Sequence, residues 1–375
     1  MRICFIVKEI FHSGYYGGFG KTTRDIGIEL TKKGHEVFIV VPKNVGQKTQ
    51  ETLDGITILG TPCPTPLRNP RKWDDISWAF FRVFVPFFYK KCNADIYHSI
   101  NPSVYSFLAK AIMPTKKHII SFRDLRIRTD WEQMSAKSPM LNKYYSRRRY
   151  LNMIDEPLIN KAIAHADNLN AATHFLITKS MKAYNLKKPP TFLPNPCRIP
   201  ERKLKKSSDP LVCFLARLDP VKRPEIFFRL AKDFPNFKFV VMGQSTNPSD
   251  HEKVIKNYKN IPNLKFLGWT FGEQKSSILE KAWVLINTSI HEGLPNAFLE
   301  AWAHQCAVLS STNPDNLVNN YGYYLNKKDE NFATGLKKLI ETDLWKENGK
   351  KGQNYVKETH DFNKILKQHL QLYKS

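Results

Sequence analysis

The stretch of residues 282–309 constrains the fold more than any other, because it joins a buried strand to a helix through a tight turn. Residues 282–289 (AWVLINTS) are largely apolar, and residues 292–296 read Glu-Gly-Leu-Pro-Asn. Pro295 suits the first turn of a helix, where its missing N–H needs no partner. The apolar residues that follow share one helical face: Ala297, Phe298, Ala301 and Trp302. A strand, a Gly turn and a helix N-terminus together suit an anion, because free N–H groups and the positive end of the helix dipole point outward there.

The same alternation of strands and helices recurs along the chain. Residues 2–7 and 35–42 predict strands on either side of a helix over residues 22–33, as in a doubly wound parallel sheet. A length of 375 residues suggests two domains, and residues 197–210, rich in Lys, Ser and Pro, predict the linker. We expect a first domain over residues 1–198 and a second over residues 199–359.

Two cations mark a second candidate site, at the end of the predicted strand 211–216. Arg217 ends this strand and Lys222 follows it, just before a helix expected from about Pro224. Two cations at a strand end can neutralise a departing diphosphate. Glu292 and Glu300 frame the Gly-Leu-Pro-Asn turn, so the expected ligand has an anionic part and hydroxyl-rich parts.

These motifs resemble those of retaining GT-B glycosyltransferases, specifically glycosyltransferase family four (group 1). The resemblance is carried by Glu292 and Glu300 around EGLPN and by Arg-Leu-Asp-Pro-Val-Lys at residues 217–222. It implies that Glu292 contacts the donor sugar, that Glu300 holds the ribose, and that the two cations bind the diphosphate. The other donor-binding residues that it implies are Gly293, Leu294, Pro295, Asn296 and, beside the base, Trp269, although Trp269 could equally be a core residue.

The resemblance also implies a fold and a reaction. The fold is α/β of the GT-B type, with two facing Rossmann-like doubly wound domains and a C-terminal crossover helix, about residues 360–375, that packs back on the first domain. The chain departs from the family pattern at Gln305 and Cys306, where a glycine is common; this affects the turn and not the chemistry. The reaction is that of a retaining hexosyltransferase (EC 2.4), which moves a hexose-type sugar from a UDP- or GDP-sugar to an acceptor hydroxyl in the assembly of cell-surface glycans or glycolipids. Because the chain contains no Asp-x-Asp, we expect neither a metal nor a cofactor besides the donor.

The acceptor side is less defined. A Gly-rich stretch over residues 12–21, with Gly18 and Gly20, follows the first strand and either lets the backbone approach a substrate or forms a turn with positive φ. His98 and Asp124 stand near the ends of two further strands, residues 94–100 and 117–124. Each could act as a base, orient the acceptor or be structural. The expected acceptor is a sugar, a lipid-linked glycan or a glycolipid.

The net charge of +24 favours anionic partners, although it could also serve solubility. Residues 1–200 hold 31 Lys+Arg and 15 Asp+Glu, so the excess concentrates there. Two alternatives remain: a glycosyltransferase with a nucleic-acid acceptor, and a non-enzymatic nucleic-acid-binding protein. No nucleic-acid module is recognisable, and EGLPN with the Arg-Lys pair argues against a sugar-nucleotide epimerase.

Residues 71–91 carry two Trp and five Phe between basic ends. This composition is typical of a segment at a membrane interface, or of an aromatic helix packed on the sheet. Residues 126–150, with Arg147–Arg149 beside tyrosines, could bind phosphates or form a solvated helix face. The six cysteines form no C-x-x-C pair, and no signal peptide or membrane span is predicted. We therefore expect a cytoplasmic protein, peripheral on the inner face of the membrane if residues 71–91 contact anionic lipid.

Overall fold

The computed structural model describes residues 1–375 except residues 8, 11–12, 15–16, 44–46, 63–69, 138, 246–247 and 327–330. The chain forms two compact units: Met1–Leu125, Ser146–Leu193 and Leu366–Ser375 make the first, and Arg126–Tyr145 and Pro194–Ile365 make the second. Residues 126–145, which the sequence placed in the first domain, thus group with the second unit. The last helix, α14 (Phe362–Lys374), enters the first unit at Leu366.

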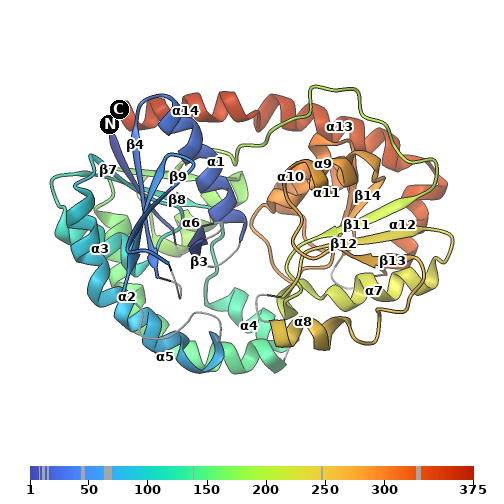
Figure 1. Cartoon of the computed structure of the whole chain (residues 1–375), viewed down its shortest axis with the longest axis horizontal. Coiled ribbons are helices and arrows are strands. Elements are labelled where there is room, and N and C mark those ends of the chain that lie inside the picture. Colours follow the sequence, from blue (N-terminus) through green and yellow to red (C-terminus); the bar gives the residue numbers. More distant parts are fainter. Residues whose placement is uncertain are drawn as a thin grey trace. The chain divides into compact units, whose positions relative to one another are not determined.

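A sheet of eight strands forms the centre of the first unit, and helices flank it (Figure 1). The strand order is β10-β9-β8-β7-β1-β4-β6-β5; β5 pairs antiparallel to β6, and the other described pairs are parallel. The strands are β1 (Arg2–Ile6), β4 (Glu36–Pro42), β5 (Gln50–Leu53), β6 (Ile56–Thr61), β7 (Ile96–Ser99), β8 (Lys117–Phe122), β9 (Asn168–Ala171) and β10 (Thr191–Phe192). The separate pair β2 (Glu9–Ile10) and β3 (Ser13–Gly14) is antiparallel. Because β1 lies between β4 and β7, the strand order reverses there, and ligands of such sheets bind beyond the carboxyl ends of these strands.

The helices of the first unit include α1 (Gly18–Lys32), α2 (Pro70–Cys92), α3 (Val104–Ile112), most of α5 (Pro139–Ala164) and α6 (His174–Tyr184). The helix predicted from residue 22 begins at Gly18, so Gly18 and Gly20 are residues of its first turn and not of a loop. The positive-φ turn is therefore wrong for these two glycines. Three sequence features fall at least partly outside the described residues: His12, the side chains of Trp73 and Trp78, and the side chains of Arg147–Arg149.

A six-stranded parallel sheet forms the centre of the second unit, in the order β13-β12-β11-β14-β15-β16. Its strands are β11 (Leu211–Leu215), β12 (Lys238–Met242), β13 (Leu264–Phe266), β14 (Val284–Asn287), β15 (Ala307–Ser310) and β16 (Gly322–Tyr324). The helices include α4 (Arg128–Lys137), α7 (Pro224–Asp233), α8 (Pro248–Ile255), α9 (Gly272–Lys281), α10 (Asn296–Ala303), α11 (Leu317–Tyr321), α12 (Phe332–Glu341) and α13 (Leu344–Thr359). Here the order reverses between β11 and β14, the strands that precede Arg217 and Glu292.

Alternate side chains of the central strands divide the core of the second unit into two layers. Val212 and Phe214 pack with α7, α8 and α12, whereas Cys213 packs with α9, α10 and α11. Burial on both faces explains why these strands read as unbroken apolar runs. The predicted pair of Rossmann-like, doubly wound sheets is confirmed. Among the described residues, no helix is both long and apolar enough to cross a membrane.

Candidate functional site

The carboxyl edge of the second sheet brings Lys222 and Glu292 into direct contact. The Lys222 Nζ lies 2.5 Å from the Glu292 Oε1, and both side chains are largely buried. The same oxygen accepts hydrogen bonds from the Ser289 Oγ (2.5 Å) and the Asn287 Nδ2 (3.2 Å). Burial alone raises the pKa of Glu292, but the Lys222 ammonium and the three hydrogen bonds outweigh it and lower the pKa below its ordinary value. Glu292 is therefore an ionised acceptor in a dry setting.

Polar side chains at the end of β15 form hydrogen bonds to Asn287, which in turn contacts Glu292. The Asn287 Oδ1 accepts from the Ser310 Oγ at 3.3 Å, and the Ser310 Oγ lies 3.1 Å from the Thr312 Oγ1. All three residues are buried. A hydrogen-bonded polar network inside the fold is rigid, because each unpaired group would carry a desolvation cost. These residues were missed by sequence reasoning, although the polar endings NTS and SST after two apolar runs were a usable signal.

Hydrogen bonds to the loops after β14 and β15 hold the turn that carries Lys222. Pro220–Lys222 forms one turn of 3₁₀ helix, and Arg223 after it has a left-handed φ of 44°. The Arg223 guanidinium donates to the Thr288 carbonyl (2.7 Å) and to the Ser311 Oγ (3.0 Å). The Thr288 Oγ1 donates back to the carbonyl of Lys222 at 2.5 Å. Arg223, which the sequence did not single out, thus fixes the cation-bearing turn against the end of β14.

Arg217 lies at the end of β11 and is the more exposed of the two predicted cations. Its Nε is 3.2 Å from the Asp219 carboxylate, and its side chain is 36% exposed. Behind it passes Gly243, with φ of 144°, where an added Cβ would stand 2.0 Å from the Ala216 carbonyl oxygen. Only glycine allows the two backbone segments to approach so closely. Their close approach sets the position from which Arg217 extends.

Helix α10 begins at Asn296, with Pro295 as the residue before it. The Asn195 Nδ2 lies 3.5 Å from the Leu294 carbonyl oxygen and 3.3 Å from the Asn296 Oδ1, so residues 294–296 are tied to the start of the second unit. Leu294 is buried, and Gly293 stands between it and Glu292. The helix N-terminus therefore follows directly on the Lys222–Glu292 pair, as an anion site requires.

Glu300 and Trp269 occupy neighbouring parts of the second unit. Glu300 pairs with the Lys275 Nζ at 2.8 Å, and both side chains are largely buried. Trp269 is half-buried and stacks on Phe271, with ring centroids 6.3 Å apart. Gln305 has a φ of 57°, in the left-handed region that favours glycine. Lys275 was not predicted from the sequence.

The structure buries His98 completely in the first unit and engages both of its ring nitrogens. Nδ1 lies 2.9 Å from the Tyr373 hydroxyl, and Nε2 lies 2.7 Å from the Ser121 Oγ. Burial, followed by the nearby His369 and Arg123, lowers the pKa of His98 well below its ordinary value. These contacts favour the structural role among those left open for His98, since the neutral ring joins the end of α14 to the sheet.

Asp124 is half-buried, and its backbone is held by Asn101. The Asn101 Oδ1 accepts from the backbone N–H groups of Arg123 (2.9 Å) and Asp124 (3.2 Å), and its Nδ2 donates to the Asp124 carbonyl at 2.6 Å. The Asn101 amide thus bridges the loops that follow β7 and β8. Asn101 was not predicted from the sequence.

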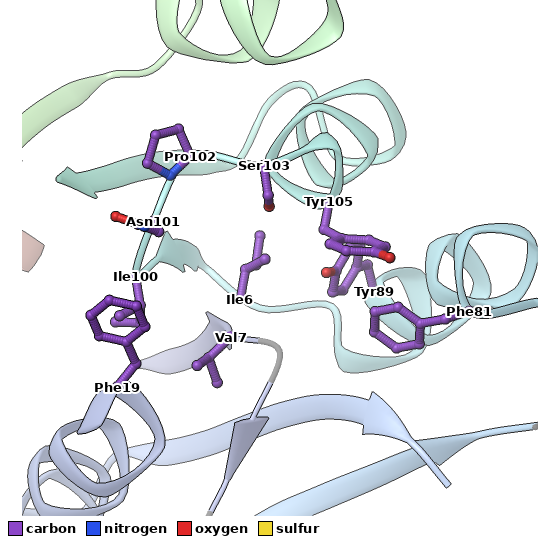
Figure 2. Close-up of a pocket in the computed structure, with 10 residues that line it drawn as sticks. All are labelled: Ile6, Val7, Phe19, Phe81, Tyr89, Ile100, Asn101, Pro102, Ser103 and Tyr105. Atoms are coloured by element: carbon purple, nitrogen blue, oxygen red, sulfur yellow. The ribbon is translucent and has the colours of Figure 1, made fainter. Parts of the chain in front are cut away.

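A pocket of about 240 Å³ opens at the carboxyl ends of β1 and β7 (Figure 2). Its walls are mostly apolar and aromatic: Ile6, Val7, Phe19, Phe81, Tyr89, Ile100, Asn101, Pro102, Ser103 and Tyr105. Phe19 comes from the first turn of α1, between Gly18 and Gly20. The glycines thus flank a ring that lines the pocket. The pocket suits an uncharged or apolar group far better than a diphosphate.

Comparisons with known proteins match most of the second unit to a family and the whole chain to solved structures. Residues 198–358 match the family model of Glycosyl transferases group 1. The whole chain superposes on sucrose-phosphate synthase of Thermosynechococcus elongatus with a TM-score of 0.76 and 15% identity, covering 99% of this chain and 98% of the other. HepE of Anabaena in complex with UDP-glucose gives a TM-score of 0.71 and 14% identity, with 99% of each chain covered.

One curated relative is a Campylobacter jejuni alpha-1,4-N-acetyl-D-galactosaminyltransferase named for the acceptor GalNAc-alpha-(1->4)-GalNAc-alpha-(1->3)-diNAcBac-PP-undecaprenol. It is 28% identical over 231 residues, which are 58% of this chain and 62% of the relative. The match thus spans less than two thirds of that protein. Residues 198–358, most of the second unit, are thus similar to group 1 glycosyl transferases. The predicted resemblance to this group is confirmed over these residues, and the predicted GT-B fold is confirmed by the whole-chain superpositions.

Proposed function

We propose that this chain transfers a hexose-type sugar from a nucleoside-diphosphate sugar to a hydroxyl of a lipid-linked glycan. The observation that carries the proposal is the buried Lys222–Glu292 pair, 2.5 Å apart, beside the N-terminus of α10 in the family-matched unit. The bound UDP-glucose named for HepE supports a uridine diphosphate donor, and the acceptor named for the Campylobacter relative supports a lipid-linked one.

In this proposal each site residue contacts one part of the donor: the charged diphosphate, the sugar hydroxyls, the ribose or the base. Arg217 and Lys222 face the diphosphate, whose negative charge grows as the sugar departs, and so stabilise the transition state more than the ground state. Glu292 accepts from hydroxyls of the donor sugar, and Glu300 from those of the ribose. Trp269 lies beside the base.

The configuration at the sugar is retained, and the departing phosphate takes the acceptor proton, so no enzymic base is needed. The cations and the helix N-terminus do the work of a metal ion, which makes the reaction independent of divalent ions. With a lipid-linked acceptor, the chain works in the cytoplasm at the inner face of a membrane.

Thermal unfolding with UDP, GDP and ADP tests the donor first, because a ligand of the folded state raises the melting temperature by mass action. Release of UDP from UDP-sugars is then followed with undecaprenyl-diphosphate glycans as acceptors, with and without EDTA. We expect stabilisation by UDP or GDP, and turnover that EDTA leaves unchanged. Turnover that strictly needs added divalent ion contradicts metal independence, and duplex DNA binding without any nucleotide effect contradicts the whole proposal.

A further inference from the structure

Helix α2 has two apolar faces, and the fold explains only one of them. Phe81, Val85 and Tyr89, spaced four residues apart, are buried in the core of the first unit. On the other side, Phe80, Val83 and Phe87 are 40%, 63% and 68% exposed. An amphipathic helix normally turns polar side chains to water. The outer face of α2 is therefore apolar for a reason other than folding.

Helix α5 extends this exposed apolar area. Its residues Met153 and Ile154 are 64% and 63% exposed. The adjacent Asp155 pairs with Arg82 of α2 at 2.5 Å, which places the two helices together. We name the set Phe80, Val83, Phe87, Met153 and Ile154 the α2–α5 surface. Phe80, Val83 and Phe87 follow helical spacing and form one exposed apolar stripe, and exposed apolar surface of this kind marks interaction sites in soluble proteins.

The charges around the α2–α5 surface indicate its partner. Residues 79–92 of α2 contain Arg82, Lys90 and Lys91 and no acidic residue. Both lysines are exposed. On α5, Asp155 is neutralised by Arg82, and Glu156 adds one exposed negative charge. Large apolar side chains beside lysines match an anionic headgroup layer over acyl chains.

We propose that the α2–α5 surface docks on an anionic lipid bilayer, with its apolar side chains in the headgroup–acyl boundary and Lys90 and Lys91 among the headgroups. A second copy of the chain is the alternative occupant, and the experiment below distinguishes it from a bilayer by the oligomeric state. Nucleic acid would use the lysines and leave the phenylalanines in water.

Docking by α2 also suits the acceptor, a point that rests on the proposed function. The inner face of the same helix supplies Phe81 and Tyr89 to the wall of the pocket (Figure 2). One helix would then touch the bilayer on one side and line the pocket on the other. A glycan attached to a membrane lipid would have a short path to this pocket.

The experiment is sedimentation of the full-length chain with phosphatidylcholine vesicles, with and without phosphatidylglycerol. We expect the wild type to pellet with the anionic vesicles. Val83→Ser with Phe87→Ser should raise the lipid concentration for half-binding at least about tenfold, because apolar burial drives interfacial binding. The matched control is Ile112→Ser with Phe175→Ser, two exposed apolar residues elsewhere on the first unit (41% and 42%), which should bind as the wild type.

Charge is tested with a second matched pair. Lys90→Gln with Lys91→Gln should weaken binding to anionic vesicles several-fold and reduce its sensitivity to salt, since the attraction is screened by ions. Lys350→Gln with Lys351→Gln removes two adjacent lysines of α13 in the second unit and should change nothing.

Failure of the wild type to pellet, or equal binding by Val83→Ser/Phe87→Ser and wild type, overturns the proposal. So does a wild-type dimer in size-exclusion chromatography that the same variant converts to monomer. Stabilisation by UDP is measured on every variant in parallel. It reports on the donor site without vesicles, so failure of the proposed function and failure of membrane docking are told apart.

Discussion

The carboxyl edges of the two sheets share a topology and differ in chemistry. In the second unit, β11 and β14 end in an ionised network around Lys222 and Glu292. In the first unit, β1 and β7 end in an apolar pocket and a buried neutral histidine. The same fold thus offers one edge suited to a charged diphosphate and another suited to an uncharged group. Side chains beyond the strand ends, and not the sheet itself, therefore decide which substrate each edge takes.

The largest effect is expected from Lys222→Ala. The variant leaves the buried Glu292 carboxylate without its cation. It also removes the positive charge proposed to face the diphosphate, so kcat/KM should fall about 10²–10³-fold. The free energy of unfolding should fall by about 3–5 kcal/mol, the cost of breaking a buried pair.

Lys275→Ala is the matched control for Lys222→Ala, because it breaks another largely buried Lys–Glu pair, that with Glu300. It should cost a similar free energy of unfolding, with a much smaller loss of kcat/KM. Steady-state kinetics and urea unfolding measure both. Because Glu300 is proposed to bind the ribose, Lys275→Ala should also cost some activity, but a loss of kcat/KM as large as that of Lys222→Ala would contradict a specific role of Lys222 at the diphosphate.

Arg217→Ala should lower kcat/KM about 10–100-fold, as expected for the loss of one charge-assisted contact to the diphosphate. The free energy of unfolding should change by less than about 1 kcal/mol, because the pair with Asp219 is partly exposed. Thermal shift by UDP should shrink in parallel. An unchanged UDP shift would place the diphosphate away from the end of β11.

Phe19→Ala tests the other edge. Phe19 is a half-buried wall of the pocket, and loss of its ring should raise KM for the acceptor about tenfold while the UDP shift stays as in wild type. Initial rates at varied acceptor and fixed donor measure this. A reduced UDP shift with an unchanged acceptor KM would reverse the assignment of the two edges.

Local sequence patterns explain why the site at the carboxyl edge of the second unit's sheet was easier to predict than that of the first unit. Lys222 and Glu292 lie seven and five residues after the ends of β11 and β14, and strand, turn and helix can all be recognised from neighbouring residues. The polar endings after β14 and β15 carried a similar signal for Asn287 and Ser310. The left-handed Arg223 had no such signal, because its role depends on contacts with Thr288 and Ser311, far along the chain.

The first edge depends on contacts between distant residues. The pocket combines Phe19, Phe81 and Tyr105 from three different helices, so no short stretch of sequence contains it. The position of His98 near a strand end left a structural role and a role at the acceptor both open. Its partner Tyr373 lies 275 residues away, and only the folded chain reveals it.

The smallest expected effect is on how the free energy of unfolding depends on pH. It distinguishes the two sheet edges, because His98 of the first unit and Glu292 of the second bind protons in different pH ranges. The pKa of His98 is lowered by burial, by His369 and by Arg123, so the folded chain keeps His98 neutral where the unfolded chain protonates it. The stability from His98 is therefore complete above about pH 6.5 and declines below it, by up to about 1.4 kcal/mol per pH unit. The pKa of Glu292 is also lowered, but for a carboxylate this stability persists until the pH falls below about 4.5.

Urea unfolding between about pH 5 and 7 measures how the free energy of unfolding changes with pH. This slope should be shallower for His98→Asn than for wild type, and unchanged for Glu292→Gln. His35, His118, His251 and His304, whose pKa values are also lowered, are present in all three proteins and cancel in the comparison. Equal slopes for wild type and His98→Asn would mean that His98 takes up a proton in the folded chain, and the first edge would then carry a charge after all.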